Sequence, residues 1–279
     1  MSNILEQYYR QPEIYISIPN NGEFYPPGVL ELPETGEIPV YAMTAKDDIN
    51  LRTPDALISG EAIAQLITSC VPSIKDPWQV PASDVDYLLV AIRIASYGGE
   101  MELEFNCSEC EHEFNYIVGL EPYIHQLSEA TFSDDNKIIP YGEIKIHLKP
   151  LSYTDLTFIQ RRTFEEQRAL RAIEGSEDAS EEEKTEFYNN ILNTMTDINI
   201  NSIASGVKGI ELPDGTFINN KDEIIAFVNN ASIRLFKKIS GVIQSERDKS
   251  SLDPLKIECP ECNHEFESPL LFDYAHFFA

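Results

Sequence analysis

The sequence predicts an α+β fold with a β-hairpin arm at the amino end, a mostly helical body and a zinc ribbon formed by two distant Cys-x-x-Cys turns. Three observations lead to this prediction. Isoleucines alternate with other residues over residues 14–18, as they do on one face of a strand. From residue 53 onward, apolar residues recur at helical spacing. Finally, the eight residues that begin at Cys107 are repeated almost unchanged from Cys259.

The composition excludes several classes of partner. The 279 residues include 47 Asp and Glu against 21 Lys and Arg, which gives a net charge of −26. Such a chain repels phosphate backbones and anionic lipid headgroups, so we expect neither nucleic acid nor a membrane as a partner. No run approaches the roughly 20 apolar residues that span a bilayer, and the amino end lacks the features of a signal peptide. We expect a soluble protein that is not exported by a cleaved signal.

We predict four segments along the chain. Residues 1–50 form a β and turn arm, in which Pro19-Asn20-Asn21-Gly22 supplies a turn and later prolines keep the strands short. Residues 51–120 form a helical core that leads into the first Cys-x-x-Cys turn. Residues 121–250 are an inserted α+β body. Residues 251–279 contain the second turn and an aromatic carboxyl-terminal tail.

Two helices are predicted within the helical core. The first starts at a Thr-Pro-Asp sequence at residue 53 and places Cys70 on its buried face, where a small apolar core residue is expected. The second starts near Ser83 and ends at Gly98. Since residues 87–92 are apolar nearly all round, we expect this second helix to be the central, buried one.

The inserted body is predicted to mix strands and helices. The polar, acidic run over residues 175–183 predicts a flexible loop or a subdomain junction within it. The expected elements are two strands around residues 140–142, helices over about 152–173 and 181–196, a hairpin over 207–218 that turns at residues 213–215, and helices over 222–228 and 233–243.

The cysteines carry the clearest functional signal. The octapeptides Cys107-Ser-Glu-Cys-Glu-His-Glu-Phe and Cys259-Pro-Glu-Cys-Asn-His-Glu-Phe agree at six positions. A Cys-x-x-Cys turn brings two thiolates to one cation while its backbone N–H groups point at the sulfurs. Two such turns complete a tetrahedral zinc site that leaves no open position for a substrate. We therefore expect one structural Zn²⁺ per chain, bound by Cys107, Cys110, Cys259 and Cys262.

The distance between the two turns along the chain is unusual for a zinc ribbon. Residues 111–258, 148 in all, separate Cys110 from Cys259. Closing so long a loop strongly constrains the unfolded chain, and metal binding is coupled to folding. We therefore expect zinc to support the folding of the whole middle segment, and a Cys259→Ser variant to disorder residues 107–262.

Other interpretations of these cysteines stay open. His112 or His264 could replace a cysteine, although a Cys-x-x-Cys-x-His set from one turn is crowded. Each turn could also share a metal with a neighbouring subunit. A redox-active Cys-x-x-Cys motif is expected to be exposed and to stand at the start of a helix. Four thiolates could also hold an iron–sulfur cluster. A disulfide framework fits five cysteines poorly.

The sequence contains no motif of a nucleotide-binding protein, serine hydrolase, metalloprotease or deaminase. The remaining histidines are isolated, so that no grouping of nucleophile, base and carboxylate can be recognised around them. We therefore expect no enzymatic activity, no catalytic residue and no small-molecule substrate.

Several runs of the amino-terminal half carry a resemblance to a known family, namely Tyr41–Asp48, Leu51–Leu57, Ser59–Ala62, Ser69–Pro72, Asp76–Trp78, Asp86–Gly98 and the Cys107/Cys110 pair. With these runs the sequence resembles the baseplate hub subunits of T-even-type contractile-tailed phages. The resemblance is dense over residues 20–120 and looser beyond. It implies a structural or assembly subunit of a phage tail baseplate hub, without enzymatic activity, whose partners are other tail baseplate proteins. It also implies a place in the virion tail baseplate, and in the host cytoplasm during assembly.

Two further expectations concern binding. The aromatic tail offers Phe272, Tyr274, Phe277 and Phe278 to a groove on a partner, with docking on the chain's own core as the alternative. The alternative function is a zinc-ribbon module that binds nucleic acid or a transcription complex. The glutamates around both Cys-x-x-Cys turns oppose it, since such a module needs a basic surface.

Overall fold

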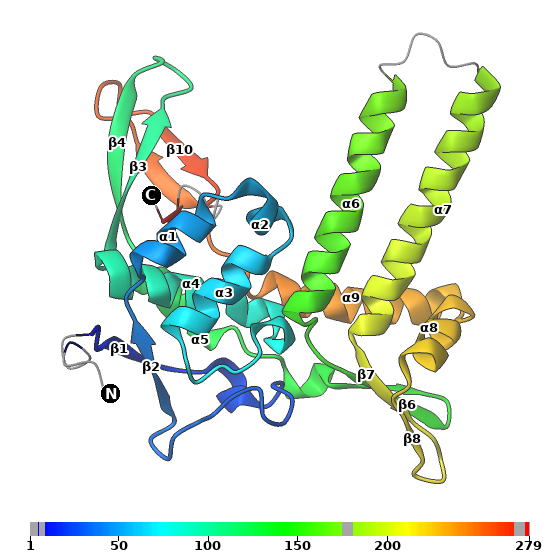
Figure 1. Cartoon of the computed structure of the whole chain (residues 1–279). Helices are drawn as coiled ribbons and strands as arrows, with labels where there is room; N and C mark the ends of the chain where they lie inside the picture. The colour runs from blue at the N-terminus through cyan, green and yellow to red at the C-terminus, as the bar shows by residue number, and fades with distance from the viewer. Residues whose placement is uncertain (1–4, 6–8, 175–180, 271–276, 279) are drawn as a thin grey trace. The chain divides into compact units, whose positions relative to one another are not determined.

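The structure is a computed structural model that describes residues 5, 9–174, 181–270 and 277–278. It has an α+β fold, as the sequence predicts, and it divides into two compact units. Unit 1 comprises residues 1–131 and 249–279, and unit 2 comprises residues 132–248. Along the chain, unit 2 is thus inserted between the two segments of unit 1. Figure 1 shows the elements of both units and labels most of them.

The first strands of unit 1 do not form a separate arm. Strand β1 (Pro12–Ser17) pairs with β2 (Glu37–Tyr41) in an antiparallel two-stranded sheet, with Ile16 opposite Ile38. Residues 18–36 connect the two strands, so the pair is not a tight hairpin, and Pro19–Gly22 forms a short 3₁₀ turn. Ile38 and Val40 are fully buried and both strands pack against helix α4, which makes them part of the core of unit 1.

Helix α1 (Ala45–Leu51) lies within the predicted arm and was not expected from the sequence. A capping box starts it: the Thr44 hydroxyl accepts a hydrogen bond from the Asp47 N–H, and the Asp47 carboxylate accepts one from the Thr44 N–H. The predicted helix that starts at residue 53 is divided into α2 (Pro54–Ile58) and α3 (Glu61–Cys70). The break follows from Gly60, whose φ of 79° is left-handed.

Helix α4 (Ala82–Tyr97) is the central helix of unit 1, as predicted. Its residues 88–92 are 0% exposed, and it contacts β1, β2, α3 and α5 (Glu121–Glu129). Each fully buried aliphatic side chain contributes about 1.5–3 kcal/mol to folding. The helix ends at Gly98, and the chain continues directly into the strand that precedes the first Cys-x-x-Cys turn.

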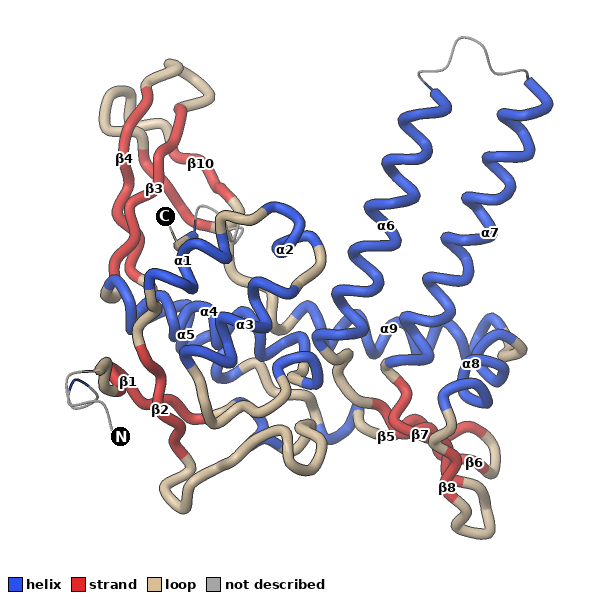
Figure 2. The backbone as a smooth tube through the Cα atoms, viewed as in Figure 1, coloured by secondary structure: helices blue, strands red, loops and turns tan. Residues whose placement is uncertain are grey.

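Both Cys-x-x-Cys turns connect the strands of short antiparallel hairpins in unit 1. Strands β3 (Glu100–Asn106) and β4 (Glu113–Gly119) flank the first turn, and β9 (Leu255–Glu258) and β10 (Glu265–Ser268) flank the second. We call them the first and second cysteine hairpins. Their strands are visible in red in Figure 2.

In its described residues, unit 2 contains an antiparallel four-stranded sheet of order β5-β6-β7-β8 and four α-helices. The predicted elements are present, although α7 extends nine residues beyond its predicted end at residue 196. Residues 175–180 of the predicted loop lie outside the described residues. The elements are β5 (Ile138–Tyr141), β6 (Ile144–Leu148), α6 (Tyr153–Glu174), α7 (Glu181–Ser205), β7 (Val207–Glu211), β8 (Phe217–Ile218), α8 (Lys221–Asn229) and α9 (Ile233–Asp248).

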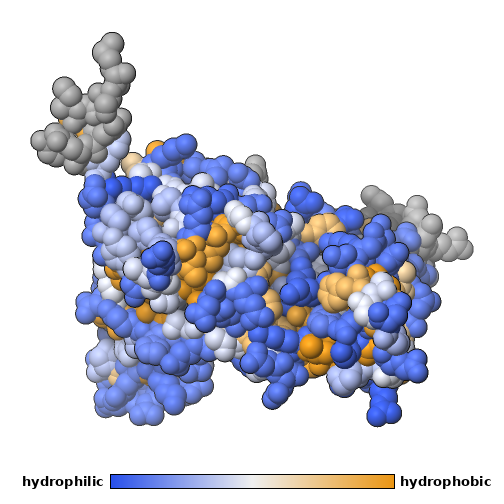
Figure 3. Space-filling model, turned by 90° about the horizontal axis from the view of Figure 1, so that it is seen from below, coloured by the Kyte–Doolittle hydropathy of each residue, from blue (hydrophilic) through white to orange (hydrophobic). Residues whose placement is uncertain are grey.

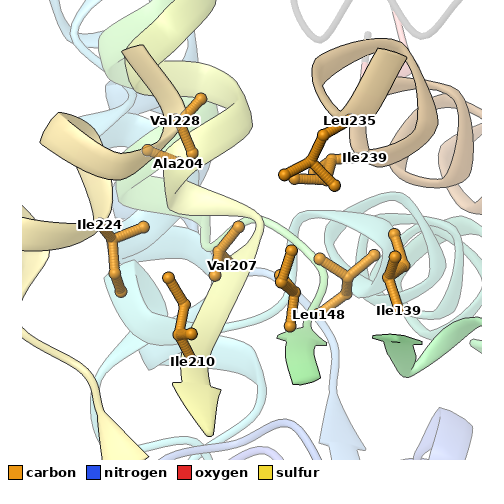
Figure 4. Packing of buried hydrophobic residues seen from close by; sticks show 10 residues of the cluster. Ile139, Leu148, Ala204, Val207, Ile210, Ile224, Val228, Leu235 and Ile239 are labelled. Carbon is orange, nitrogen blue, oxygen red and sulfur yellow. The ribbon is translucent and has the colours of Figure 1, made fainter. Parts of the chain in front are cut away.

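Unit 2 has a hydrophobic core of its own. Side chains from its strands pack against side chains from α8 and α9 and from the end of α7 (Figure 4). Because this core is internal to unit 2, we expect its stability not to depend on closing the loop between the cysteine hairpins. The expectation that zinc supports the whole middle segment is therefore revised. The core residues are Ile139, Ile146, Leu148, Ala204, Val207, Ile210, Ile224, Val228, Leu235 and Ile239.

The face of the molecule in Figure 3 is largely hydrophilic, with hydrophobic residues in small patches. This pattern agrees with the large excess of charged acidic side chains in the sequence. Among the helices that the structure describes, none combines the length and the apolar character that a bilayer span requires.

Candidate metal centre

The four predicted cysteines come together in unit 1. The Sγ atom of Cys107 lies 3.6 Å from that of Cys262, and the Sγ atom of Cys110 lies 3.7 Å from that of Cys259. All four sulfurs lie within 4.8 Å of one another. A tetrahedral zinc ion with Zn–S distances of about 2.3 Å separates its sulfur ligands by about 3.8 Å. The arrangement therefore fits a four-thiolate metal site.

The two cysteine hairpins present their sulfurs through the same backbone turn. In the first hairpin the Cys107 N–H donates to the carbonyl of His112, and the Glu111 N–H donates to the carbonyl of Cys107. The second hairpin repeats both bonds with Cys259, His264 and Asn263. Glu111 and Asn263 take left-handed φ values of 58° and 56°, which the tight turn requires. The identity of the two octapeptides thus corresponds to an identity of conformation.

Burial divides the four thiols into two classes. Cys107 and Cys259, the first cysteine of each turn, are 1% and 0% exposed, whereas Cys110 and Cys262 are exposed. A metal ion at the centre of the four sulfurs would therefore be covered on one side by the hairpins and reached by solvent on the other. With four protein ligands it would have no open coordination position, as in structural zinc sites.

Backbone N–H groups stabilise the thiolate form of Cys107. Hydrogen bonds from the backbone N–H groups of Cys110 and Glu109 lower the pKa of Cys107 to about 6. At Cys262 the backbone N–H of His264 also favours the thiolate, but the hydrogen bond with Cys110, burial and the other cysteines outweigh it and raise the pKa to about 12. The group of four cysteines thus forms one thiolate easily and a further thiolate only with difficulty. A divalent cation supplies the charge that lets all four thiols ionise.

Aromatic side chains join the two hairpins beside the sulfurs. The ring of Phe105 lies edge-on to Phe266 of the second hairpin, with centroids 6.4 Å apart, and edge-on to Tyr116 at 6.3 Å. The Tyr116 hydroxyl donates a hydrogen bond to the carbonyl of Lys256 at 3.5 Å. Sequence reasoning missed this cluster. Its signal is the aromatic residue placed two positions before Cys107, in a strand that alternates apolar and acidic side chains.

The chain leaves unit 1 for unit 2 and returns to it at neighbouring points. The Lys249 ammonium donates to the carbonyl of Thr131 at 3.4 Å, and the Gln126 side-chain amide donates to the carbonyl of Ser251 at 3.1 Å. Residues 131 and 249 are therefore held close together by contacts outside the cysteine hairpins.

The two histidines of the octapeptides pack against phenylalanines. His112 is stacked on Phe114 with an interplanar angle of 10°, and His264 is stacked on Phe266 at 14°, each with centroids 6.1 Å apart. Among the described residues, the group of side chains that could hold a metal ion consists of the four cysteines. The geometry thus favours four thiolates over a site with histidine ligands.

The other residues that the sequence analysis considered lie apart from this site. Cys70 is buried in α3, where burial raises the pKa of its thiol to about 11, and it fits the predicted core role. Phe277 and Phe278 are 3% and 2% exposed, with their rings edge to face at 5.0 Å. Their burial favours docking on the chain's own core over an open partner surface. Phe272 and Tyr274 lie outside the described residues.

Comparison with known proteins gives one family. A family model described as "T4 bacteriophage base plate protein" matches residues 29–279. The match includes all four cysteines and the whole of unit 2. Searches of the curated proteins and of the solved structures gave no match.

Proposed function

We propose that this chain is a hub subunit of a phage tail baseplate and binds other tail proteins. The chain belongs to the T4 bacteriophage base plate protein family and so has a structural role in a phage baseplate. The observation that carries this proposal is the extent of the family match, which runs through both units from residue 29 to residue 279. The hub assignment rests in addition on the runs over residues 41–110 that resemble hub subunits.

The proposal gives the four cysteines a structural task. Bound zinc would supply a link between the two cysteine hairpins and no chemistry toward a substrate, because thiolates fill its coordination sphere. Cys107, Cys110, Cys259 and Cys262 would hold it, and the Phe105 cluster would exclude water from one side of the link. We therefore include one zinc ion per chain and no enzymatic activity in the proposed function.

Exposed apolar side chains in unit 2 support binding to other proteins. Helices α6 and α7 form a long antiparallel pair (Figure 1) and present Phe158, Phe164 and Leu192 with 45–64% of each side chain exposed. Large apolar residues held open on a helix pair are typical of a surface that a partner covers. Because Phe277 and Phe278 are buried, the helix pair is the better candidate for this contact, while Phe272 and Tyr274 stay candidates from the sequence alone.

The position of the chain within tails from infected cells tests the proposal. A phage that carries a tagged copy of the chain is grown, tails are purified, and the tag is located by cryo-electron microscopy. The proposal predicts labelled particles with density at the centre of the baseplate, or labelled hub assembly intermediates. Label at the periphery would contradict the hub role, and its absence from tails and from intermediates would contradict the whole proposal.

The alternative, a zinc-ribbon module that binds nucleic acid, is opposed by the charge of the cysteine hairpins. Nine exposed glutamates lie on them or beside them, and phosphate backbones are repelled by such a surface. Titration with single- and double-stranded DNA at several salt concentrations should show no binding at physiological salt, and measurable affinity there would revive the alternative. The nine are Glu102, Glu104, Glu109, Glu111, Glu113, Glu258, Glu261, Glu265 and Glu267.

A further inference from the structure

Arg93 in α4 differs from the other buried polar side chains that the structure describes. Asp84, for example, accepts hydrogen bonds from the Tyr25 hydroxyl at 3.0 Å and the Ser83 hydroxyl at 2.9 Å. Glu246 accepts one from the Ser133 N–H and one from the Asn136 side chain. Arg93 is 7% exposed, yet its Nε and Nη1 atoms are buried without a hydrogen-bond partner in the structure.

Such an arrangement costs folding free energy. A guanidinium that leaves water without a compensating acceptor loses its hydration, and burial accordingly lowers the pKa of Arg93. Partners of the right charge are plentiful, since 27 of the 47 acidic residues belong to unit 1 by sequence, against 7 Lys and Arg. No salt bridge nevertheless joins Arg93 to any acid in the described part of the chain. The buried Arg93 guanidinium thus has no acidic ion-pair partner among the described residues.

The Arg93 side chain contacts an aromatic ring at the end of α4. The Arg93 guanidinium carbon lies 4.4 Å from the centre of the Tyr97 ring, in a cation–π contact. Tyr97 is the last residue of α4 and is 49% exposed. A turn of this ring would open the guanidinium to a group approaching the end of α4.

We propose that Arg93 is held for a carboxylate that another baseplate protein brings to the end of α4, with Tyr97 as its cover. The guanidinium binds a carboxylate through two parallel hydrogen bonds, and a desolvated Arg beside a Tyr is the kind of pair that dominates protein interfaces. The partner is thus expected to carry an aspartate, a glutamate or a free carboxyl terminus at the contact. This inference rests on the proposed function, because it takes the partner to be a tail protein.

The test compares Arg93→Met with the wild type in two measurements. Replacing an unpaired buried charge by an apolar side chain of similar length should leave the melting temperature of the purified, zinc-loaded chain unchanged or raise it. In infected cells that depend on the variant, the amount of the chain recovered in tails or hub intermediates should fall at least tenfold. Arg93→Lys keeps the charge and loses the paired hydrogen bonds. Its recovery in tails or hub intermediates should lie between those of the wild type and Arg93→Met.

Arg52→Met is the matched control, since Arg52 forms an exposed ion pair with Asp48 on α1 and should change neither measurement. Two results would overturn the inference: a melting temperature of Arg93→Met clearly below that of the wild type, which would mean that the guanidinium is engaged within the fold, or unchanged recovery in tails. Failure of the proposed function itself looks different, because the wild-type chain would then be missing from tails and intermediates. In that case the melting temperatures in sodium acetate and in sodium chloride test the inference. Acetate should raise the melting temperature of the wild type above that in chloride and should have no such effect on Arg93→Met. Equal effects on the two proteins would overturn the inference.

Discussion

The Sγ atoms of Cys107 and Cys262 lie 3.6 Å apart although 155 positions separate the two residues in the chain. Between them the chain builds the whole of unit 2 and returns to unit 1, where Lys249 contacts Thr131. The four-cysteine site therefore fastens two hairpins of the same unit to each other. Because unit 2 has its own core, we expect it to stay folded without this link.

Loss of the metal should unfold the cysteine hairpins and spare unit 2. In a Cys259→Ser variant, or after chelation, amide hydrogens of residues 100–119 and 255–268 should exchange much faster, because the hairpins lose the link between them. Exchange in the strands of unit 2 should stay slow. Hydrogen exchange followed by mass spectrometry measures both regions in one experiment.

An Ile239→Ala variant provides the reverse control. Ile239 is fully buried in the core of unit 2, so its truncation should cost about 2–5 kcal/mol there and leave the zinc content at one per chain. If Cys259→Ser instead accelerated exchange throughout residues 132–248, the hairpins would be holding the whole insertion, as the spacing of the cysteines first suggested.

The carboxyl-terminal phenylalanines should contribute to stability. Truncation of Phe278 to alanine removes a buried ring and should cost about 3–5 kcal/mol in unfolding free energy. Ile117→Ala, on the exposed side of β4, should change stability by less than about 0.5 kcal/mol. Chemical denaturation of the purified variants checks both values. If Phe278→Ala kept its stability but was incorporated less into tails, Phe278 would instead be a contact to a partner protein.

Asp84 should make the protein less stable as the pH rises toward neutrality. Burial raises the pKa of this carboxyl to about 7, although hydrogen bonds from Ser83 and Tyr25 partly oppose the shift. In the unfolded chain the carboxyl ionises near pH 4. The folded form therefore holds a proton that the unfolded form has lost, and stability declines between about pH 4 and pH 7, by up to about 4 kcal/mol from this group.

The Asp84→Asn variant isolates this effect, because it cannot ionise. Urea denaturation at pH 5 and at pH 8 should show a larger loss of stability for the wild type than for the variant. Other groups titrate in both proteins and cancel in the comparison. An equal loss in the two proteins would mean that the Asp84 carboxyl is already ionised in the folded state at pH 5.

Replacing the histidines should leave the metal in place. His112→Ala and His264→Ala remove a ring that is stacked on a phenylalanine, so we expect a small loss of stability, on the order of 1 kcal/mol, and one zinc ion per chain. Cys110→Ser, in contrast, should lose the metal under the same dialysis. Loss of zinc from either histidine variant at the level of Cys110→Ser would make that histidine a ligand.

The cluster of four cysteines was predictable because each half of it is local in the sequence. Each turn of four residues fixes two sulfurs, and the repetition of the octapeptide at Cys259 shows that two turns belong together. The central helix α4 was predictable for the same reason, since its apolar run over residues 87–92 needs no partner to be recognised.

The errors arose where distant residues or single positions decide the structure. The Thr44–Asp47 capping box starts α1 inside a proline-rich region, and Gly60 divides a periodic pattern into two helices. The independent core of unit 2 joins Ile139 to Ile239, a hundred positions apart, which no local pattern reveals. Arg93 could have been noticed in the sequence, because it is the one charged residue in the run 87–95, which is otherwise apolar.

X-ray absorption spectroscopy of the purified, zinc-loaded chain tests the central claim most directly. It reports the kind, number and distance of the atoms around the metal. The four sulfurs brought together by the two cysteine hairpins predict one zinc ion per chain with four sulfur neighbours at about 2.3 Å and no nitrogen or oxygen neighbour. A first shell that contains nitrogen or oxygen, or a chain purified under reducing conditions that binds no zinc, would contradict it.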